Sequence, residues 1–546
     1  MTRWIAAAAL FVIVWMAYLP GNMGCSDSMW SIPTAVSLVD HHNPDLDEHL
    51  PILRSRGFVF TQRLGGHFFT IYPLGASIMA APGVVILRPL AAAIRSRTPS
   101  VWKWLERVQR ERGCPPLDDE PVIALHSWTE HLIASALVAA TVVVMFFVAG
   151  RQMSIATAVA VALLFAFGTS AWSTASRSLW QHGPSMLLLA LALLIQLRGG
   201  PLFWVGVLLA AGYVVRPTNV IPLAVMGGWT LLSAPRKLPH FVLGAAIVAG
   251  LFLWSNVRVY GVWLPPYYLP GFYTKNYFIA DALAGNLISP ARGLFVFSPI
   301  FVLSIVGLVM NVGTRRGTWL DAAVAVTLVL HWIAIAASNG NWWGGDSYGP
   351  RFFADLLPYL TFLTLPVFTW LESAQGVRWS LSAAAIGVLS AVSVAVHAQG
   401  ALNRATADWN VYPVSVSVEP YRVWDWQHPQ FLAGLTFTPA PTPPVDLSIL
   451  ACAAPPGAPG VPAIVENHGG TVVLQWQPAA GPVAVYIMDV GSGPGLSDEP
   501  RREARDVFHP QVIAHRVPPG TYYVRVRGRN RCGDGPPSPE VAVTVR

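Results

Sequence analysis

Long uninterrupted apolar segments restrict the fold of this chain more than any other feature. A transmembrane helix needs about 20 predominantly apolar residues. Only 12% of the 546 residues are charged, roughly half of the 25% found in an ordinary soluble protein. This composition excludes a disordered chain and argues against a cytosolic enzyme. We therefore predict a polytopic α-helical membrane protein with about eleven spans, at 4–19, 126–148, 154–172, 181–197, 201–216, 218–233, 239–258, 295–312, 319–338, 352–371 and 379–397.

A twelfth apolar segment, 69–90, decides the topology. It contains Pro73, Pro82 and Pro89, and we predict a re-entrant or interface-lying element here instead of a span. The basic residues of the short loops then all lie inside with the N-terminus, as the positive-inside rule requires. They are Arg3, Arg151, Arg198, Arg236, Lys237, Arg315, Arg316 and Arg378. These loops explain the net charge of +7 better than nucleic-acid binding does.

This topology places four loops and the tail on the outer face. The loops are 20–125, 173–181, 259–294 and 339–351. We predict a membrane domain over 1–400, with 20–125 as its first outer loop, and an extracytoplasmic connector over 401–454. The C-terminal domain, 455–546, also lies outside in this arrangement.

The tail differs from the rest of the chain because short alternating runs replace the long apolar ones. These runs lie at 472–476, 483–487, 522–527 and 541–545, and they predict an all-β sandwich. With Trp476 at the position of a core tryptophan and Tyr522 at that of a tyrosine corner, 455–546 resembles a fibronectin type III domain. The resemblance implies an accessory or interaction module, and both a passive spacer and a glycan-binding role are open.

Four cysteines lie on the predicted outer face, in agreement with an oxidising compartment. Four cysteines allow three disulfide connectivities. The pairs Cys25–Cys114 and Cys452–Cys532 are plausible, because the second would join the start of the sandwich to one of its turns. The cysteines show no metal-binding spacing.

The first outer loop carries an acid, Asp27, a few residues beyond the first predicted helix. A carboxylate at the membrane surface can meet a lipid headgroup and a soluble acceptor together, and can act as a general base. An N-cap for the helix that follows is the alternative. Farther along, the loop has acids and histidines that could bind a divalent cation or form a solvated turn: Asp40, Asp45, Asp47, Glu48, His41, His42 and His49.

Further polar and aromatic residues gather at the outer ends of the predicted helices. Tyr72 lies in the first loop, and His182 opens a helix, where a capping role is the alternative. The segment 339–351 combines Trp342, Trp343, Asp346 and Arg351 with several glycines. Aromatic rings stack on sugars and Arg binds phosphate, whereas an aromatic belt at the membrane interface is the alternative.

With these motifs, residues 1–400 resemble the GT-C superfamily of polytopic glycosyltransferases, which includes protein O-mannosyltransferases and aminoarabinose transferases. The resemblance lies in a short first helix, a large outer loop that begins with an acid, here Asp27, and a Tyr-Pro-Leu element at 72–74. His182 and the Trp-Gly-Gly and Tyr-Gly-Pro-Arg sequences that begin at Trp343 and Tyr348 complete it.

The resemblance implies transfer of a sugar from a polyprenyl-phosphate donor, with inversion, to an extracytoplasmic glycan, lipid or protein. Asp27 would be the catalytic residue, and Tyr72, His182, Trp342, Trp343, Asp346 and Arg351 would contact substrates. Arg351, Arg292 and Arg216 are candidates for the donor phosphate, although Arg351 could instead pair with Asp355 four residues later. A divalent cation is a possible cofactor, but the family's paired acids are reduced here to Asp27 alone.

The resemblance also implies a multi-pass protein of the cytoplasmic (inner) membrane of a bacterium. Two other classes are open: a transporter or flippase of lipid-linked glycan, and a non-enzymatic envelope scaffold. Transporters usually carry ionisable residues deep within their helices, and His331 is the clearest such residue here. The concentration of charge at the outer helix ends favours the enzyme.

Overall fold

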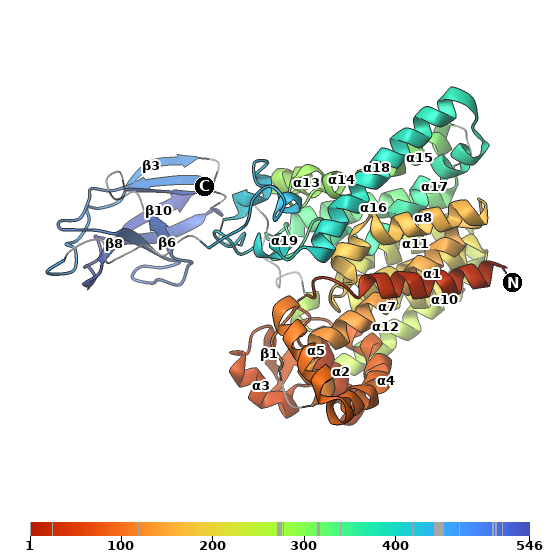
Figure 1. Cartoon of the computed structure of the whole chain (residues 1–546), viewed down its shortest axis with the longest axis horizontal. Helices are drawn as coiled ribbons and strands as arrows, with labels where there is room; N and C mark the ends of the chain where they lie inside the picture. The colour runs from red at the N-terminus through yellow and green to blue at the C-terminus, as the bar shows by residue number, and fades with distance from the viewer. Residues whose placement is uncertain are drawn as a thin grey trace. The chain divides into compact units, whose positions relative to one another are not determined.

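The structure is a computed structural model, shown in Figure 1. It describes residues 2–24, 26–117, 120–269, 276, 278–313, 317–338, 340–417, 419–441, 452–468, 470–504, 507, 510–515 and 517–546. Cys25, Arg315 and Arg316 lie outside these residues. The chain divides into two compact units. The first comprises Met1–Asp408 and Trp426–Thr438, and the second comprises Trp409–Asp425 and Pro439–Arg546.

The first unit is a helix bundle, and each of the eleven predicted apolar segments overlaps one of its long helices. They are α1 (Thr2–Tyr18), α7 (His126–Ala149), α8 (Ile155–Phe167), α9 (His182–Leu197), α10 (Leu202–Val215), α11 (Val220–Ser233), α12 (Leu238–Tyr260), α15 (Val302–Gly313), α16 (Trp319–Ser338), α17 (Leu357–Ser373) and α18 (Gly376–Leu402). Their apolar side chains form one large core. The predicted helical fold class is confirmed.

Six helices of the described part of the chain are long and apolar enough to cross a membrane, judged by length and composition. They are Gly75–Arg97, His126–Ala149, Pro235–Tyr260, Trp319–Ala337, Arg351–Ser373 and Gly376–Leu402. Six further apolar helices are shorter. The number of spans stays a prediction.

Several of the predicted spans are not continuous α-helices. The segment 154–172 leaves the α-helical form after α8 and continues into a π-helical turn, η2 (Ala171–Ala175). The segment 295–312 begins with α14 (Leu294–Phe297) and η7 (Pro299–Phe301) before α15 starts. Pro299 is the cause of the second break, because proline lacks an amide hydrogen and its ring disfavours helix in the preceding residue.

The first outer loop folds into a small helical region with its own core, built around Trp30, Leu46, Leu53 and Val84. Its elements are α2 (Ser31–Asp40), η1 (Asp47–His49), α3 (Leu50–Ser55), β1 (Thr61–Leu64), β2 (His67–Thr70), α4 (Gly75–Arg97), α5 (Pro99–Arg112) and α6 (Pro121–Ala124). β1 and β2 form an antiparallel hairpin.

The disputed apolar segment forms α4, which packs mainly against α2 of this loop. Arg88, near the middle of α4, makes a two-pronged ion pair with Asp40 at 2.6 and 2.9 Å and contacts Glu120 at 3.1 Å. The length and composition of α4 meet the criterion for a span. Its predicted non-spanning position therefore stays a prediction.

Short elements connect the long helices or follow the last of them. They are η3 (Pro217–Asn219), η4 (Pro235–Lys237), η5 (Pro266–Tyr268), α13 (Ile279–Ile288), η8 (Arg351–Leu356), α19 (Ala405–Asp408), η9 (Pro420–Trp424) and η10 (Gln430–Leu432). Among these, η8 is a 3-10 helix that leads into α17.

The second unit contains the predicted β-sandwich. One sheet has the order β10-β8-β5-β6, with β9 paired to β8, and the other has the order β3-β4-β7. Inward-facing side chains of both sheets, Trp476 among them, form one core. The strands are β3 (Ala463–His468), β4 (Thr471–Gln475), β5 (Val485–Gly491), β6 (Arg502–Ala504), β7 (Gln511–Ala514), β8 (Gly520–Asn530), β9 (Gly533–Asp534) and β10 (Val541–Val545). Membership of the fibronectin type III family stays a prediction.

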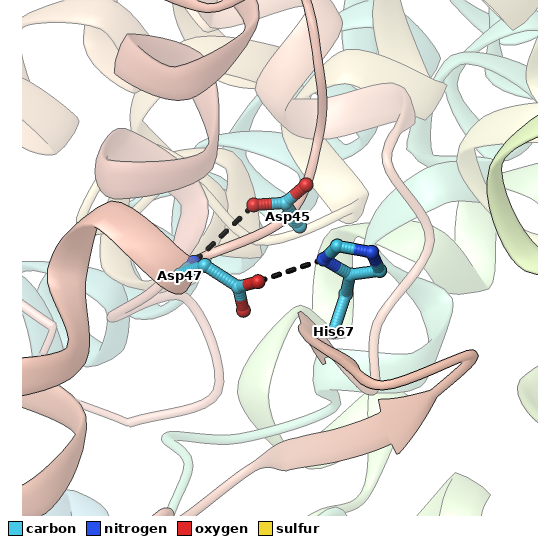
Figure 2. Close-up of side chains that lie close together, drawn as sticks. All are labelled: Asp45, Asp47 and His67. Atoms are coloured by element: carbon cyan, nitrogen blue, oxygen red, sulfur yellow. Dashed lines mark hydrogen bonds and ion pairs between the residues drawn. The ribbon is translucent and has the colours of Figure 1, made fainter.

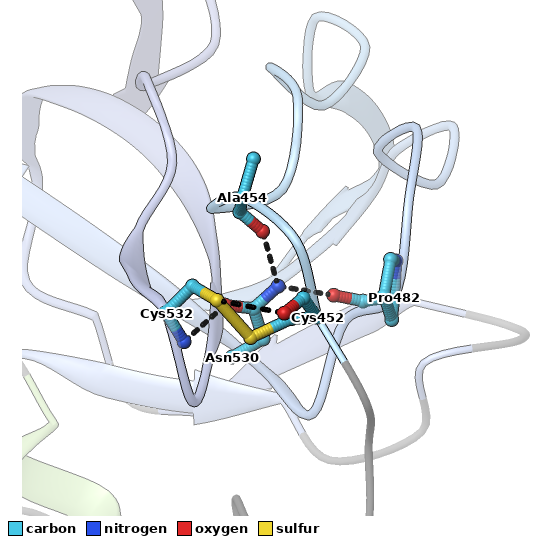
Figure 3. Close-up of a disulfide and its surroundings, with 5 residues drawn as sticks. All are labelled: Cys452, Ala454, Pro482, Asn530 and Cys532. Carbon is cyan, nitrogen blue, oxygen red and sulfur yellow. Dashed lines mark hydrogen bonds between the residues drawn. A yellow bond between two sulfur atoms is a disulfide. The ribbon is translucent and has the colours of Figure 1, made fainter.

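A disulfide joins Cys452 to Cys532, the pairing expected from the sequence (Figure 3). The Asn530 side chain next to it donates to the carbonyls of Ala454 at 3.1 Å and Pro482 at 2.9 Å. These contacts attach the chain before β3 to the turn after β8. Cys114 is also disulfide-bonded, and its expected partner, Cys25, lies outside the described residues.

Candidate functional site

Five of the residues singled out from the sequence line one small cavity of about 50 Å³ in the helix bundle. They are Asp27, Tyr72, His182, Arg216 and Arg351. The wall also includes Ser28, Ser31, Pro73, Ala76, Leu179, Trp180, Gln181, Tyr267 and Phe352. Residues far apart in the chain therefore form a single polar site.

These side chains meet because they stand at or near the ends of helices. His182 is the first residue of α9, Arg216 directly follows α10, and Arg351 opens η8 ahead of α17. Asp27 comes from the loop after α1. Charged groups are costly inside an apolar bundle, so they collect at helix ends.

Asp27 and Arg351 form the ion pair at the centre of the cavity. Arg351 donates from Nη2 to Asp27 Oδ2, and both side chains remain partly accessible, at 13% for Arg351 and 24% for Asp27. The Arg351 guanidinium also lies 4.5 Å from the centre of the Trp180 ring and donates from Nη1 to Gly344 O at 3.3 Å. The pair presents one anionic and one cationic group to the same small space.

Tyr72 stands beside this pair. Burial, and after it the neighbouring Asp27 carboxylate, raise the pKa of the Tyr72 hydroxyl well above its ordinary value. The hydroxyl therefore stays protonated and can donate a hydrogen bond to an anion. Asp27, Arg351 and Tyr72 together offer an acceptor and two kinds of donor.

A second ionic group lies behind the first. His182 Nδ1 is 2.5 Å from Asp355 Oδ1, and Arg216 Nη1 donates to both Asp355 oxygens at 2.6 and 2.8 Å. Asp355 is completely buried. Arg216, expected to hold a donor phosphate, lines the cavity but has this carboxylate as its partner.

The alternative pairing of Arg351 with Asp355 is wrong. Residues four apart share a face of an α-helix, but 351–356 is a 3-10 helix with three residues per turn. Arg351 and Asp355 consequently point to different partners. Asp355 is a site residue that the sequence interpretation missed, and an acid at the start of an apolar run is the signal that could have found it.

Another missed carboxylate lies deeper, at Glu130 in α7. It accepts from Ser178 Oγ at 2.8 Å and from the Leu179 amide at 3.2 Å, and Ser178 Oγ is hydrogen-bonded to Ser28 Oγ. Because Ser28 follows Asp27, this buried acid helps to fix the loop that carries Asp27. Buried ionisable groups are thus less scarce than the sequence interpretation had them.

The two tryptophans of the glycine-rich loop before Arg351 do not line the cavity. Trp342 is 2% exposed, and a Cβ on Gly285 would lie only 2.0 Å from its ring. It is a core residue packed on α13. Trp343 is partly buried and lies edge-on to Trp342. Neither tryptophan is among the residues that line the cavity.

Arg292 is hydrogen-bonded to the backbone of the same loop. Its guanidinium donates to the carbonyls of Trp343 at 2.6 Å and Gly345 at 2.9 Å, and to Gln430 Oε1 at 2.6 Å. It is buried and does not line the cavity. Asp346 also lies outside the lining, but its carboxylate interacts electrostatically with Asp27, Arg292 and Arg351. The loop geometry depends on glycine, since Gly345 has a φ of +60°.

One cluster in the described part of the chain has the donor types of a metal site. Figure 2 shows Asp45, Asp47 and His67, with one possible ligand atom from each lying within 4.8 Å of the others. Two carboxylates and an imidazole suit a divalent metal. Asp47 accepts from His67 Nδ1 at 2.7 Å and from the Phe68 amide at 2.9 Å, so protein contacts already hold the cluster together. None of the three residues lines the Asp27 cavity.

The fold and the cavity define a polytopic helical membrane protein with a charged site where its helices end. No protein-family model and no curated protein matches the chain. Among solved structures, it is similar to ArnT from Cupriavidus metallidurans bound to undecaprenyl phosphate and to the same protein in the apo state. Each match is 14% identical with a TM-score of 0.44 and covers 75% of this chain, and 69% and 68% of the respective ArnT chains. A similarity of this degree assigns no role to any residue of the cavity.

Proposed function

We propose that this chain is a membrane glycosyltransferase that transfers a sugar from a polyprenyl-phosphate donor to an extracytoplasmic acceptor, with inversion. One observation carries the proposal. The charged cavity around Asp27 and Arg351 shares Tyr72, Pro73 and Tyr267 with a second, apolar cavity of about 460 Å³. A substrate with an anionic head and a long apolar tail would fill both cavities at once.

The apolar cavity suits the tail of such a donor. Its walls include Val214 at the end of α10, Val248 and Phe252 of α12, and Tyr268 of η5. Trp254 also lines it and is 63% exposed on the outer surface of α12. An apolar, aromatic cavity that reaches the lipid-facing side of a helix can admit an isoprenoid chain from the bilayer.

The charged cavity suits the head. Arginine binds phosphate through several donors, so Arg351, assisted by the Tyr72 hydroxyl, is the group that we assign to the donor phosphate. Four charged side chains, Asp27, Arg351, Asp355 and Arg216, balance in this region without substrate. An incoming phosphate therefore competes with Asp27 for Arg351, and the competition leaves the Asp27 carboxylate available to the acceptor.

The reaction follows from this arrangement. Asp27 accepts the proton of the acceptor hydroxyl while the acceptor oxygen attacks the anomeric carbon of the sugar. The new carbon–oxygen bond forms as the bond to the phosphate oxygen breaks, and polyprenyl phosphate leaves with the electron pair, stabilised by Arg351. A single displacement inverts the anomeric carbon. Arg292 and Asp346 act at a distance, since the first holds the loop before Arg351 and the second contributes only charge.

In this proposal the protein lies in the inner membrane of a bacterium, with the cavity at the outer face of that membrane. Arg88 supports a non-spanning α4, because a span would bring this ion-paired group close to the middle of the bilayer. The sandwich lies on the same side, where a disulfide such as Cys452–Cys532 persists. The acceptor is a glycan, lipid or protein of that compartment.

The test compares Asp27→Asn with wild type in lipid nanodiscs supplied with a panel of labelled polyprenyl-phosphate sugars. Loss of the base should lower transfer by about 10²- to 10⁴-fold. Binding of undecaprenyl phosphate should persist, because Arg351 loses a competitor. Asp47→Asn is the matched control, since Asp47 lies in the same outer loop but does not line the cavity.

Unchanged transfer by Asp27→Asn would remove Asp27 from the mechanism. A wild-type protein that binds no polyprenyl phosphate would refute the enzyme proposal as a whole. A transporter or flippase would instead move a labelled lipid between leaflets without releasing polyprenyl phosphate.

A further inference from the structure

A row of hydrogen bonds leads from the cavity into the protein interior. Arg351 Nε donates to His182 Nε2 at 3.2 Å, and His182 Nδ1 is 2.5 Å from Asp355 Oδ1. Arg216 Nη1 bonds both oxygens of the same carboxylate. The His182 ring is nearly buried and the Asp355 carboxylate completely so.

One tautomer of His182 satisfies the contact with Arg351. An arginine Nε always carries hydrogen and can only donate, so His182 Nε2 must be the acceptor. The imidazole is then neutral, with its hydrogen on Nδ1, where it donates to Asp355. Arg216 Nη1 also lies 2.5 Å from Nδ1, and Nδ1 would accept from it in the other tautomer, with the ring hydrogen on Nε2. We choose the tautomer that keeps the Arg351 bond, in which Arg216 and Nδ1 both direct their hydrogens to Asp355.

This order of donors constrains Arg351 strongly. Its Nε is held by His182 and its Nη1 by the carbonyl of Gly344, while its plane lies over the Trp180 ring. Nη2 faces Asp27. A flexible side chain is thereby kept in one orientation, with one nitrogen directed into the cavity.

We propose that His182 and Asp355 are positioning residues for Arg351. Asp355 orients the imidazole, and the imidazole presents a bare nitrogen that fixes the guanidinium for the donor phosphate. The inference rests on the proposed function, because it assigns Arg351 to the phosphate. It also explains why Arg216 lies here: it neutralises a buried carboxylate that would otherwise be unpaired.

Two substitutions of His182 separate the effect of its hydrogen bonds from the effect of its size. In His182→Gln, the side-chain oxygen can accept from Arg351 and the side-chain nitrogen can donate to Asp355, so the row is preserved. In His182→Leu both bonds are lost. With undecaprenyl phosphate as the probe, titrated against protein in nanodiscs, we expect binding about 10- to 100-fold weaker in His182→Leu, the effect of one lost hydrogen bond to a charged group. His182→Gln should stay within about threefold of wild type, less than the effect of a single net hydrogen bond.

A double-mutant cycle tests the part played by Asp355. If Asp355 acts through His182, Asp355→Asn should weaken binding in the wild-type background and add little in the His182→Leu background. A merely structural contribution would instead be additive. Thermal unfolding of each variant checks that the bundle is intact, and the His182→Gln variant keeps the test decisive if His182→Leu fails to fold.

Equal binding by His182→Leu and wild type would overturn the proposal, as would weak binding by His182→Gln or additive effects in the cycle. These results leave the glycosyltransferase proposal standing. Absence of undecaprenyl phosphate binding by the wild-type protein would refute both.

Discussion

The contact between α10 and α12 offers a sharp test of the structure, because two glycines allow these helices to touch. A Cβ on Gly244 of α12 would lie 2.1 Å from the Phe203 carbonyl oxygen, and one on Gly206 of α10 would lie 2.1 Å from that of Phe241. Real contacts of this kind essentially never fall below 3.0 Å. Gly244→Ala must therefore separate the two helices by about 0.9 Å, the difference between these distances.

Two opposing effects set the magnitude. Overpacking a close contact costs about 1 to 3 kcal/mol, whereas replacing glycine by alanine inside a helix gains about 1 kcal/mol. Gly250 provides the control, because it lies in the same helix with nothing within 4 Å of an added Cβ. Gly250→Ala should be neutral or stabilising, so the difference between the two variants isolates the steric cost.

The assay is thermal unfolding of both variants in the same detergent, followed by intrinsic fluorescence. At about 2 °C per kcal/mol for a large domain, Gly244→Ala should melt about 2 to 6 °C below Gly250→Ala. It should also weaken binding of undecaprenyl phosphate, because α10 and α12 form walls of the apolar cavity. Identical melting of the two variants would refute the close helix contact and the reasoning built on it.

Three further predictions address the other parts of the chain. Replacing Cys452 and Cys532 by serine in the full chain removes a crosslink between residues 80 positions apart. The lost loop-closure entropy should lower the stability of the sandwich by about 4.5 kcal/mol, which should appear as faster hydrogen exchange throughout the β5–β8 pair at moderate urea. Unchanged exchange would contradict the entropic account. A topology reporter fused after Arg112 should respond as extracytoplasmic, and a cytoplasmic response would overturn the placement of α4. Asp47 raises the pKa of His67 through their hydrogen bond, so the ion pair is complete at a pH below the ordinary histidine range and is lost as the pH rises through the raised pKa. Over this pH range, hydrogen exchange of the β1–β2 amides should increase more in wild type than in His67→Gln. Equal increases would show that the pair does not stabilise the hairpin.

Much of the helical framework could be predicted because it depends on local composition. The apolar segments at 126–148 and 319–338 became α7 and α16 with ends within a residue of the prediction. The strands of the sandwich followed from alternation, as at 541–545, which became β10. In both cases the spacing of apolar residues along the chain predicts whether one face or the whole segment is buried.

The site was predictable only in part. Asp27, His182 and Arg351 were found because they lie at the outer ends of apolar helices, in motifs that resemble the GT-C superfamily, and they do meet in one cavity. Their partners could not be found in this way. Asp355 was considered only as an alternative partner of Arg351, on α-helical spacing, and the 3-10 geometry of 351–356 directs it to His182 and Arg216.

The tryptophans show the same limit from the other side. Trp342 has the residue type of a sugar-stacking platform, yet it is buried against Gly285, 57 positions earlier in the chain. Whether an aromatic ring faces a cavity or a core depends on what packs against it. The order of residues alone carries no information on that choice.

From its order of residues alone, this chain had to place many apolar helices in a membrane and attach a β-sandwich to them, because burial of apolar surface acts on every segment wherever it lies. The same order gathered its few charges at helix ends. Only the tertiary structure decided which acid pairs with which arginine, that the polar cavity shares Tyr72, Pro73 and Tyr267 with an apolar one, and that Asp355 contacts His182. Those outcomes depend on distances of a few ångströms between helices far apart in the chain, and such distances are set by packing.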